Sequence, residues 1–326
     1  MKKILKITGI LLSLFIAVAA GAIIYLNTAY PNVDPPANVK INYTPEMISR
    51  GEYLANNVAV CMDCHSERDF SRFSGPIVEG TEGKGGMLMD EEHGIPGKIY
   101  MKNITPAAIG DWTDGDLIRA ITMGVNKKGE ALFPMMPYPH YNEMTEEDLH
   151  SIIAYVRTLK PIEASYPDKE LNFPLNYLIK TMPLQSYNPA KINKNNPVEY
   201  GKYLVTMASC NHCHTPSEKG EPVAGMDFAG GNEVNLPFGT IRSANITPDL
   251  QTGIGAWTKE IFIAKFKAYD PVVHGYKEVK PGEFNSIMPW AMYAGMTEED
   301  LGAMYEYLKT MKPIRNHVVR FTPINQ

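Results

Sequence analysis

Hydrophobic and polar positions divide the chain into one long apolar segment and a body with helical periodicity. Residues 7–26, ITGILLSLFIAVAAGAIIYL, contain no charged side chain. A helix of this length spans about 30 Å, the thickness of the hydrocarbon core of a bilayer. A cleavable signal peptide has an apolar region of about 7–15 residues followed by a small-residue cleavage site. Here Ile23–Leu26 prolong the apolar region. The pattern therefore favours an uncleaved anchor at residues 1–27 over the alternative, a cleaved signal.

Positive charge flanks the apolar segment on one side only. Lys2, Lys3 and Lys6 precede it. Because lysines beside a membrane span are retained in the cytoplasm, we expect the N-terminus to be cytoplasmic. The prediction is a single-pass protein of the bacterial cytoplasmic membrane, with the rest of the chain on the periplasmic side. Residues 28–44 are rich in Pro and Asn, and we expect them to form a tether.

Beyond the tether, the hydrophobic pattern predicts a mainly α-helical body. Residues 51–61 place apolar side chains near helical spacing. The motif TEED at residues 145–148 and 297–300 has a threonine that can cap free N–H groups, and carboxylates that favour the positive end of a helix dipole. An apolar face and a proline follow each motif, as expected for a helix and its end: Leu149, Ile152, Ile153, Val156 and Pro161 after the first, and Leu301, Met304, Tyr305, Leu308 and Pro313 after the second.

The body is an internal repeat. Four blocks recur in the same order: RGEYLANNVAVCMDCH and YGKYLVTMASCNHCH; NITP at 103–106 and 245–248; Trp-Thr at 112–113 and 257–258; and MPYPHYNEMTEEDL and MPWAMYAGMTEEDL. This indicates a duplicated unit of two tandem domains rather than a short-period array. We expect domain 1 at 45–162, a linker at 163–196 with a short element near 171–179, domain 2 at 197–318, and a C-terminal tail at 319–326.

Composition narrows the range of functions. Hydrophobic residues make up 44% of the chain and charged residues 21%, as in folded globular proteins. The formal net charge is −5 and no basic stripe is present, which argues against nucleic-acid binding. All four cysteines lie in two C-x-x-C pairs, so no conventional disulfide framework is available.

Each C-x-x-C pair is followed directly by a histidine, in CMDCH at 61–65 and CNHCH at 210–214. A four-cysteine zinc site would leave both histidines unused, and a thioredoxin-type pair needs neither histidine but requires a preceding strand. Covalent haem attachment uses all three residues of each motif, because two thioethers hold the porphyrin and the histidine binds the iron. The sequence therefore predicts two covalently attached haem c groups, held by Cys61, Cys64 and His65 and by Cys210, Cys213 and His214.

A second axial ligand is predicted from the repeat. Met136 and Met288 align, and each is followed by Pro and an aromatic residue. Met135 aligns with Ile287, so ordinary packing is its preferred interpretation. A thioether ligand stabilises ferrous iron, and filling both axial positions leaves no ready site for oxygen or peroxide. The expected task is electron transfer.

These motifs resemble those of class I cytochrome c domains, used twice. The G-x-Y-L segment before C-x-x-C-H, the NITP and Trp-Thr block, and M-P-[YW] followed by M-T-x-E-D-L are most similar to cytochrome c subunits of bacterial membrane-bound alcohol, aldehyde and gluconate dehydrogenases. The resemblance implies that the first and last helices of each domain cross, with Gly51 and Tyr53 near Tyr155, and Gly201 and Tyr203 near Tyr307.

The same resemblance implies further contacts with the cofactor. It places Asn103, Trp112, Asn245 and Trp257 near the haem propionates. In the alternative, each asparagine only forms part of a turn and each tryptophan only packs its indole in the core. It also implies that a proline carbonyl after the motif accepts the second N–H of the ligand histidine, with Pro76 and Pro222 as candidates.

The resulting functional prediction is a non-enzymatic respiratory-chain electron carrier. It would relay electrons from a periplasmic-side dehydrogenase or quinol oxidiser to an oxidase or a soluble cytochrome, and its acidic charge would suit a lysine-rimmed partner. One alternative is the dihaem subunit of a terminal oxidase complex. Another is a dihaem peroxidase, against which the two matched Met-Pro-aromatic motifs argue.

Some features have no match in the repeat. Residues 81–94 form an insert of the first unit, either a partner-docking loop or a solvated one. The remaining histidines are expected at the surface: His93, His140, His150, His212, His274 and His317.

Overall fold

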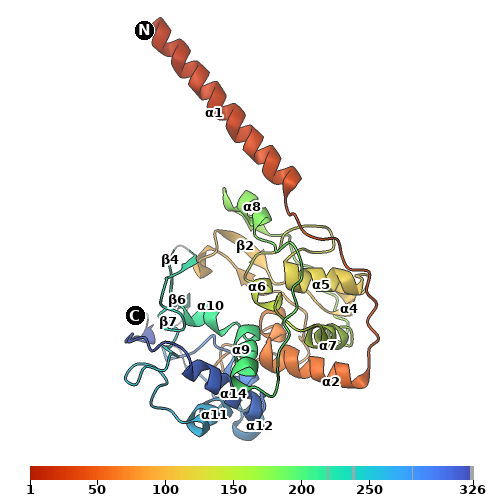
Figure 1. Cartoon of the computed structure of the whole chain (residues 1–326), viewed down its shortest axis with the longest axis vertical. Helices are drawn as coiled ribbons and strands as arrows, with labels where there is room; N and C mark the ends of the chain where they lie inside the picture. Colours follow the sequence, from red (N-terminus) through yellow and green to blue (C-terminus); the bar gives the residue numbers. More distant parts are fainter. Residues whose placement is uncertain (219, 237–238, 281, 324–326) are drawn as a thin grey trace.

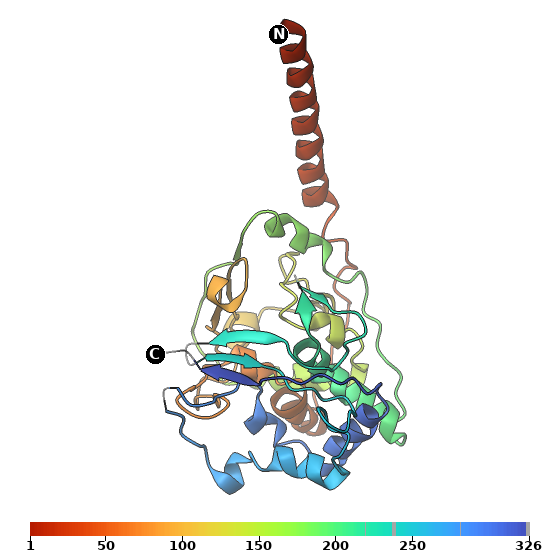
Figure 2. The ribbon, with the colours of Figure 1, turned by 90° about the vertical axis from the view of Figure 1, so that its left-hand side faces the viewer.

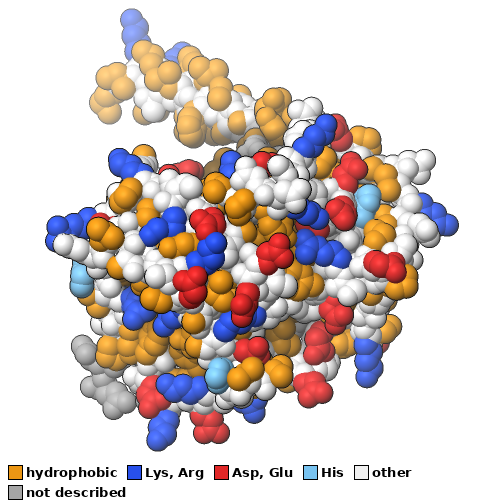
Figure 3. Space-filling model, turned by 60° about the horizontal axis from the view of Figure 1, so that its bottom comes forward, with side chains coloured by type: hydrophobic (Ala, Val, Ile, Leu, Met, Phe, Trp, Pro, Cys, Tyr) orange, Lys and Arg blue, Asp and Glu red, His pale blue; other side chains and the backbone are white. Residues whose placement is uncertain are grey.

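A computed structural model describes residues 1–218, 220–236, 239–280 and 282–323. Helix α1 (Lys2–Ala29) projects from a rounded, helix-rich body (Figure 1). No residue of α1 is buried, and its apolar side chains are exposed along its length (Figure 3). By length and composition, α1 is able to cross a membrane, as the sequence predicts.

A crossing of two helices organises each repeat. In repeat 1 (residues 45–162), α2 (Pro45–Tyr53) packs across α7 (Glu146–Val156); in repeat 2 (residues 197–318), α9 (Pro197–Met207) packs across α14 (Glu298–Lys309). The helices begin where their caps predict. Thr145 and Thr297 accept hydrogen bonds from the backbone N–H groups of the aspartates three residues later.

Glycine allows the close approach at each crossing. A Cβ atom on Gly51 would lie 1.8 Å from the Ser151 carbonyl oxygen and 2.9 Å from Cβ of Tyr155. The expected contact with Tyr155 is therefore present. A Cβ atom on Gly201 would lie 1.8 Å from the Ala303 carbonyl oxygen, one turn before Tyr307. Only a residue without a side chain fits either position.

The helices between the crossing pair correspond in part. In repeat 1 they are η1 (Leu54–Val58), α3 (Cys61–His65), η2 (Glu91–His93), α4 (Pro106–Ile109), α5 (Asp114–Met123) and α6 (Tyr138–Tyr141). In repeat 2 they are α10 (Cys210–His214), α11 (Lys259–Lys267), α12 (Pro271–His274) and α13 (Trp290–Tyr293). Helices α3, α5 and α6 of repeat 1 are matched by α10, α11 and α13 of repeat 2. The Cys motifs thus lie on α3 and α10, and the Met-Pro motifs directly precede α6 and α13.

Short antiparallel strands lie between the Cys motifs and NITP, and a strand from the linker and a strand from the C-terminal tail pair with them. Strands β1 (Leu88–Met89), β2 (Gly97–Tyr100) and β3 (Glu170–Leu171) form one sheet, and β4 (Ser217–Glu218) pairs with β5 (Glu221–Pro222). Strands β6 (Glu233–Leu236), β7 (Gly239–Arg242) and β8 (Phe321–Pro323) form the third. The sequence pattern does not predict these strands, because two-residue and four-residue strands are too short to produce a clear alternating pattern.

The tether and the linker lie against repeat 1. Ile41 N donates to Asp114 Oδ2 at 2.9 Å, and the Tyr43 hydroxyl donates to the same carboxylate, so the tether segment is docked on α5. The linker pairs with β2 through β3, forms α8 (Leu175–Leu178) and η3 (Ile179–Thr181), and returns to donate from the Tyr187 hydroxyl to the Met144 carbonyl at 2.6 Å. The short element expected in the linker is present as α8.

The two repeats share one hydrophobic core. Helix α6 of repeat 1 packs on α9, and α13 of repeat 2 packs on η1, so each repeat contacts the other through equivalent elements. Figure 2 shows both repeats grouped below α1. On the surface, acidic and basic side chains alternate over the face shown in Figure 3.

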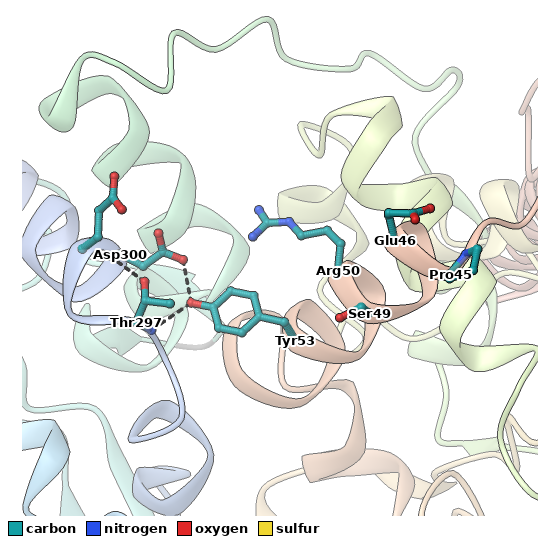
Figure 4. Close-up of a pocket in the computed structure, with 8 residues that line it drawn as sticks. Pro45, Glu46, Ser49, Arg50, Tyr53, Thr297 and Asp300 are labelled. Carbon is teal, nitrogen blue, oxygen red and sulfur yellow. Dashed lines mark hydrogen bonds between the residues drawn. The ribbon is translucent and has the colours of Figure 1, made fainter.

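Reciprocal tyrosines connect the repeats. The Tyr53 hydroxyl donates to Asp300 Oδ2 at 2.6 Å and accepts from Thr297 N at 3.1 Å (Figure 4). The Tyr203 hydroxyl donates to Asp148 Oδ2 at 2.7 Å. The hydroxyl of each tyrosine therefore reaches the start of the last helix in the other repeat, a contact that the sequence does not predict. The expected position of Tyr53 near Tyr155 and of Tyr203 near Tyr307 stays a prediction.

Candidate haem sites

The two Cys motifs have the same local backbone. Each forms a helix of one turn, preceded by a residue in the left-handed region, Val60 with φ 45° and Ser209 with φ 52°. This conformation is unusual for a β-branched residue and persists only where the surrounding structure imposes it. The sharp turn separates the first long helix of each repeat from the helix that carries the cysteines.

The histidines of both motifs are fixed in one tautomer. His65 Nδ1 lies 2.7 Å from the Lys102 carbonyl oxygen, and His214 Nδ1 lies 2.7 Å from the Ala244 carbonyl oxygen. A carbonyl oxygen only accepts, so each Nδ1 carries the proton and each Nε2 keeps its lone pair. Burial lowers the pKa of both imidazoles, although the hydrogen bond opposes it. A neutral imidazole with a free Nε2 is the form that binds iron.

The carbonyl that accepts the Nδ1–H proton is not the proline carbonyl that the resemblance implies. It belongs in both repeats to the residue directly before the NITP asparagine, whereas the Pro76 carbonyl accepts from Asp69 N. Pro222 lies in β5. Positions 102 and 244 match in the repeat only through the NITP block that follows each of them.

Two glycines that the sequence interpretation missed hold the histidine backbones. Gly85 N donates to the His65 carbonyl at 2.8 Å, and Gly230 N donates to the His214 carbonyl at 2.7 Å. Both glycines have positive φ, and a Cβ atom on either would lie about 2.5 Å from backbone atoms before NITP. Gly85 lies within residues 81–94, so this insert matches repeat 2 in part and supports the backbone of His65. Its helix η2 lies beside β6 of repeat 2.

The side chains of the NITP asparagines form hydrogen bonds with other parts of the protein. Asn103 Oδ1 accepts from the N–H and hydroxyl of Thr105, and its Nδ2 donates to the Ile162 carbonyl at 2.7 Å. Asn245 does the same with Thr247 and the Ile314 carbonyl. Each asparagine ties the turn to the segment after the last helix. This geometry fits the turn interpretation, and contact with a haem propionate stays a prediction.

The methionines, the indoles and the first cysteine of each motif contact the same core. All are half-buried and pack against it: Cys61, Trp112 and Met136 in repeat 1, and Cys210, Trp257 and Met288 in repeat 2. The turn after each methionine is the same, with Tyr138 N donating to the Met136 carbonyl at 2.7 Å and Trp290 N to the Met288 carbonyl at 2.8 Å.

A second pair of tyrosines links each methionine segment to its Cys motif. The Tyr141 hydroxyl donates to the Ala59 carbonyl at 2.8 Å, and the Tyr293 hydroxyl donates to the Ala208 carbonyl at 3.0 Å. Each accepting residue lies two positions before the first cysteine. The sequence interpretation missed these residues, although their alignment in the repeat was a usable signal.

The cysteines fit haem attachment better than the alternatives. Within the described residues, no group of three His, Cys, Asp or Glu side chains is arranged to hold a metal ion, and the four cysteines form no disulfide. Burial raises the pKa of Cys61, Cys64 and Cys210 to about 12, so these thiols are poorly suited to thiolate exchange chemistry. Paired cysteines on one turn, beside a histidine with a free Nε2, suit a covalently held porphyrin.

Comparison with known proteins agrees with this geometry. Residues 198–312 match the cytochrome c family. This segment is a cytochrome c domain. Such domains bind haem c covalently, and Cys210, Cys213, His214 and Met288 all lie inside it.

The wider chain is homologous to cytochrome c subunits of dehydrogenases. It is 32% identical to the fructose dehydrogenase cytochrome subunit of Gluconobacter japonicus over 65% of this chain and 43% of that protein. It is 27% identical to the cytochrome c subunit of the quinone alcohol dehydrogenase of Gluconobacter oxydans, over 82% and 55%, and 27% identical to the gluconate 2-dehydrogenase cytochrome c subunit of Pantoea cypripedii, over 81% and 59%. The chain spans about half the length of the curated relatives it matches.

Of the six histidines that are not candidate ligands, His212, His274 and His317 are exposed, as expected, whereas His93, His140 and His150 are half-buried.

Proposed function

We propose that the chain is a membrane-anchored dihaem cytochrome c that relays electrons. The observation that carries the proposal is the duplicated histidine geometry, with His65 and His214 each donating from Nδ1 to the carbonyl before NITP and each leaving Nε2 free. In this proposal Cys61, Cys64, Cys210 and Cys213 hold the two porphyrins, and Met136 and Met288 provide the second axial ligands. When bound, haem supplies an iron that alternates between its ferric and ferrous states.

The shared core supports direct transfer between the two sites. Cys61 and Cys210 pack against one continuous hydrophobic cluster, and the Met-Pro helices α6 and α13 each contact the first helical segment of the other repeat. Both sites therefore lie beside the same interface. Electrons passing between the repeats would cross packed protein rather than solvent.

The homologues support a dehydrogenase as the electron donor. Three of them are named as cytochrome subunits of fructose, alcohol and gluconate dehydrogenases. In the proposed complex this chain takes electrons from a periplasmic-side dehydrogenase or quinol oxidiser and passes them to a terminal oxidase or a soluble cytochrome. Helix α1 holds it to the cytoplasmic membrane, and the lysines before α1 keep its N-terminus in the cytoplasm.

Replacing either methionine tests the ligand assignment. Met136→Leu and Met288→Leu each remove a thioether with little change in volume. Each variant should keep two covalent haems, lose the weak far-red sulfur–iron absorption of one haem, and lower the reduction potential of that haem in a potentiometric titration.

The matched control is Met135→Leu, at the neighbouring position that aligns with Ile287. This variant should leave both the spectrum and the two potentials unchanged. An unaltered spectrum in Met136→Leu or in Met288→Leu would remove that methionine from the proposal.

A further inference from the structure

We propose that residues 172–182, here called the linker foot, rest on the anionic surface of the membrane beside the anchor. The inference depends on the proposed function through one element only, the membrane span α1. The foot comprises the segment Asn172–Met182, with α8 and η3, and belongs to the linker between the two repeats.

The position of the foot relative to α1 carries the first part of the inference. Both α8 and η3 contact α1, and Lys180 Nζ donates to Asn27 Oδ1, one residue beyond the apolar run 7–26. Figures 1 and 2 show α8 as the part of the body beside the C-terminal end of α1. When residues 7–26 fill the hydrocarbon core, Asn27 lies at its edge and the foot lies at the level of the lipid headgroups.

The side chains of the foot carry the second part. Phe173 is 77% exposed, Leu178 45% and Met182 38%, whereas Ile179 is 2% exposed and fastens the segment to the body. The ring of Phe173 meets Tyr177 edge to face, with centroids 6.3 Å apart. Several exposed apolar side chains within one short segment indicate an interaction surface, and aromatic residues are favoured at the membrane interface.

The charge of Lys180 indicates an anionic membrane surface as the partner, and the attachment of the foot to repeat 1 determines what membrane contact would do. Lys180 lies at the same level and would face anionic headgroups, which attract basic side chains. The foot is held to repeat 1 on both sides, by β3 pairing with β2 and by Leu184 N donating to the Met123 carbonyl at 3.1 Å. Contact with the membrane at α1 and at the foot would therefore hold repeat 1 at one orientation above the bilayer.

Spin labels measure the depth of the foot. The full-length protein carries one introduced cysteine at a time, Phe173→Cys or Leu178→Cys, and is placed in nanodiscs of phosphatidylethanolamine and phosphatidylglycerol. The haems are kept ferrous and low-spin, so that they do not relax the label. The readout is the accessibility of the label to apolar oxygen relative to a polar nickel chelate. Subtracting the wild-type spectrum isolates the introduced label whether or not the native cysteines react.

Two further labels make the result decisive. Ser13→Cys in the middle of α1 reports the anchor, and Val272→Cys on α12, which is 93% exposed, reports solvent. We expect oxygen-to-nickel ratios at 173 and 178 that lie several-fold above the ratio at 272 and fall below the ratio at 13. Ratios at 173 and 178 equal to that at 272, with Ser13→Cys in the bilayer, would overturn the foot alone. A solvent-like ratio at 13 would instead refute the anchor.

Discussion

At the scale of single residues, one serine distinguishes the two methionine segments. Ser74 is 2% exposed and follows the Cys motif of repeat 1. Its hydroxyl donates to the Met288 carbonyl and accepts from Trp290 N at 2.9 Å, while Asn285 Oδ1 accepts from Ser74 N at 2.8 Å. The loop after the first Cys motif therefore holds the backbone turn directly after the candidate ligand Met288, and it also bonds the side chain of Asn285 before it. Among the described residues, no side chain of repeat 2 bonds the backbone around Met136 in this way.

Ser74→Ala should loosen the Met288 segment and leave Met136 unaffected. The change removes two hydrogen bonds, each worth about 0.5–1.5 kcal/mol in the free energy of unfolding, although Trp290 N and the Met288 carbonyl remain bonded to each other. Denaturant titration should report this loss, and far-red absorption should weaken for one haem only. The control is Ser71→Ala, because the hydroxyl of Ser71 bonds only the nearby Asp69. A stable variant with an unchanged spectrum would show that Ser74 does not position Met288.

The side chains of the candidate haem sites could be predicted from the sequence more fully than the backbone groups that hold them in place. The C-x-x-C-H motif is defined by the identity of its side chains, so both copies can be recognised in the sequence. The partner of each histidine is a backbone carbonyl, which any residue supplies, so Lys102 and Ala244 have no signature of their own. The same holds for the N–H groups of Gly85 and Gly230.

At the scale of secondary-structure elements, the crossing of first and last helices organises each repeat. Amphipathic periodicity and the TEED caps predict the last helices, α7 and α14, well, whereas α2 begins at Pro45, before the segment 51–61 that the pattern indicates. The docking of residues 37–43 on α5 could not be predicted, because Pro- and Asn-rich chain has no period and one of its main contacts is made by a backbone N–H group, that of Ile41. Packing of this kind depends on the partner surface, which the local sequence does not contain.

Gly51→Ala and Gly201→Ala should force the crossing helices apart. A methyl group would overlap a backbone carbonyl of the facing helix in both cases, and overpacking of this kind costs about 1–3 kcal/mol. The midpoint of denaturant unfolding should fall accordingly. Gly302→Ala in α14 is the matched control, because its nearest contact would be ordinary, at 3.4 Å from the Lys259 side chain. This control should be neutral or stabilising, since alanine favours helix. Equal unfolding midpoints for all three variants would contradict the close approach of the helices at the two crossings.

At the scale of the whole molecule, the two repeats contact each other through a direct interface and are not connected by the linker alone. The reciprocal contacts of Tyr53 with Asp300 and of Tyr203 with Asp148 join the first helix of each repeat to the last helix of the other. Repetition in the sequence reveals that two similar units exist. It does not reveal the interface, because the matched tyrosines were equally compatible with contacts inside their own repeats.

The two tyrosines should differ in their effect on stability. Asp148 also pairs with Arg50 at 3.0 Å, whereas the described residues include no ion pair to Asp300. Tyr53→Phe should therefore lower the free energy of unfolding by about 1.5–3 kcal/mol, as expected for a hydrogen bond to a charged group, and Tyr203→Phe by less. Chemical denaturation of both variants measures the difference. The account of the interface would be wrong if Tyr203→Phe proved the more destabilising change.

The central claim is that both Cys motifs carry haem, one on each side of the shared interface. The most direct measurement is the intact mass of the purified chain under denaturing conditions, which removes every group that is not covalently bound, with peptide mapping of Cys61–His65 and Cys210–His214. The account predicts the mass of the chain plus two haem groups, with one haem on each peptide. A mass corresponding to one haem or none would contradict it.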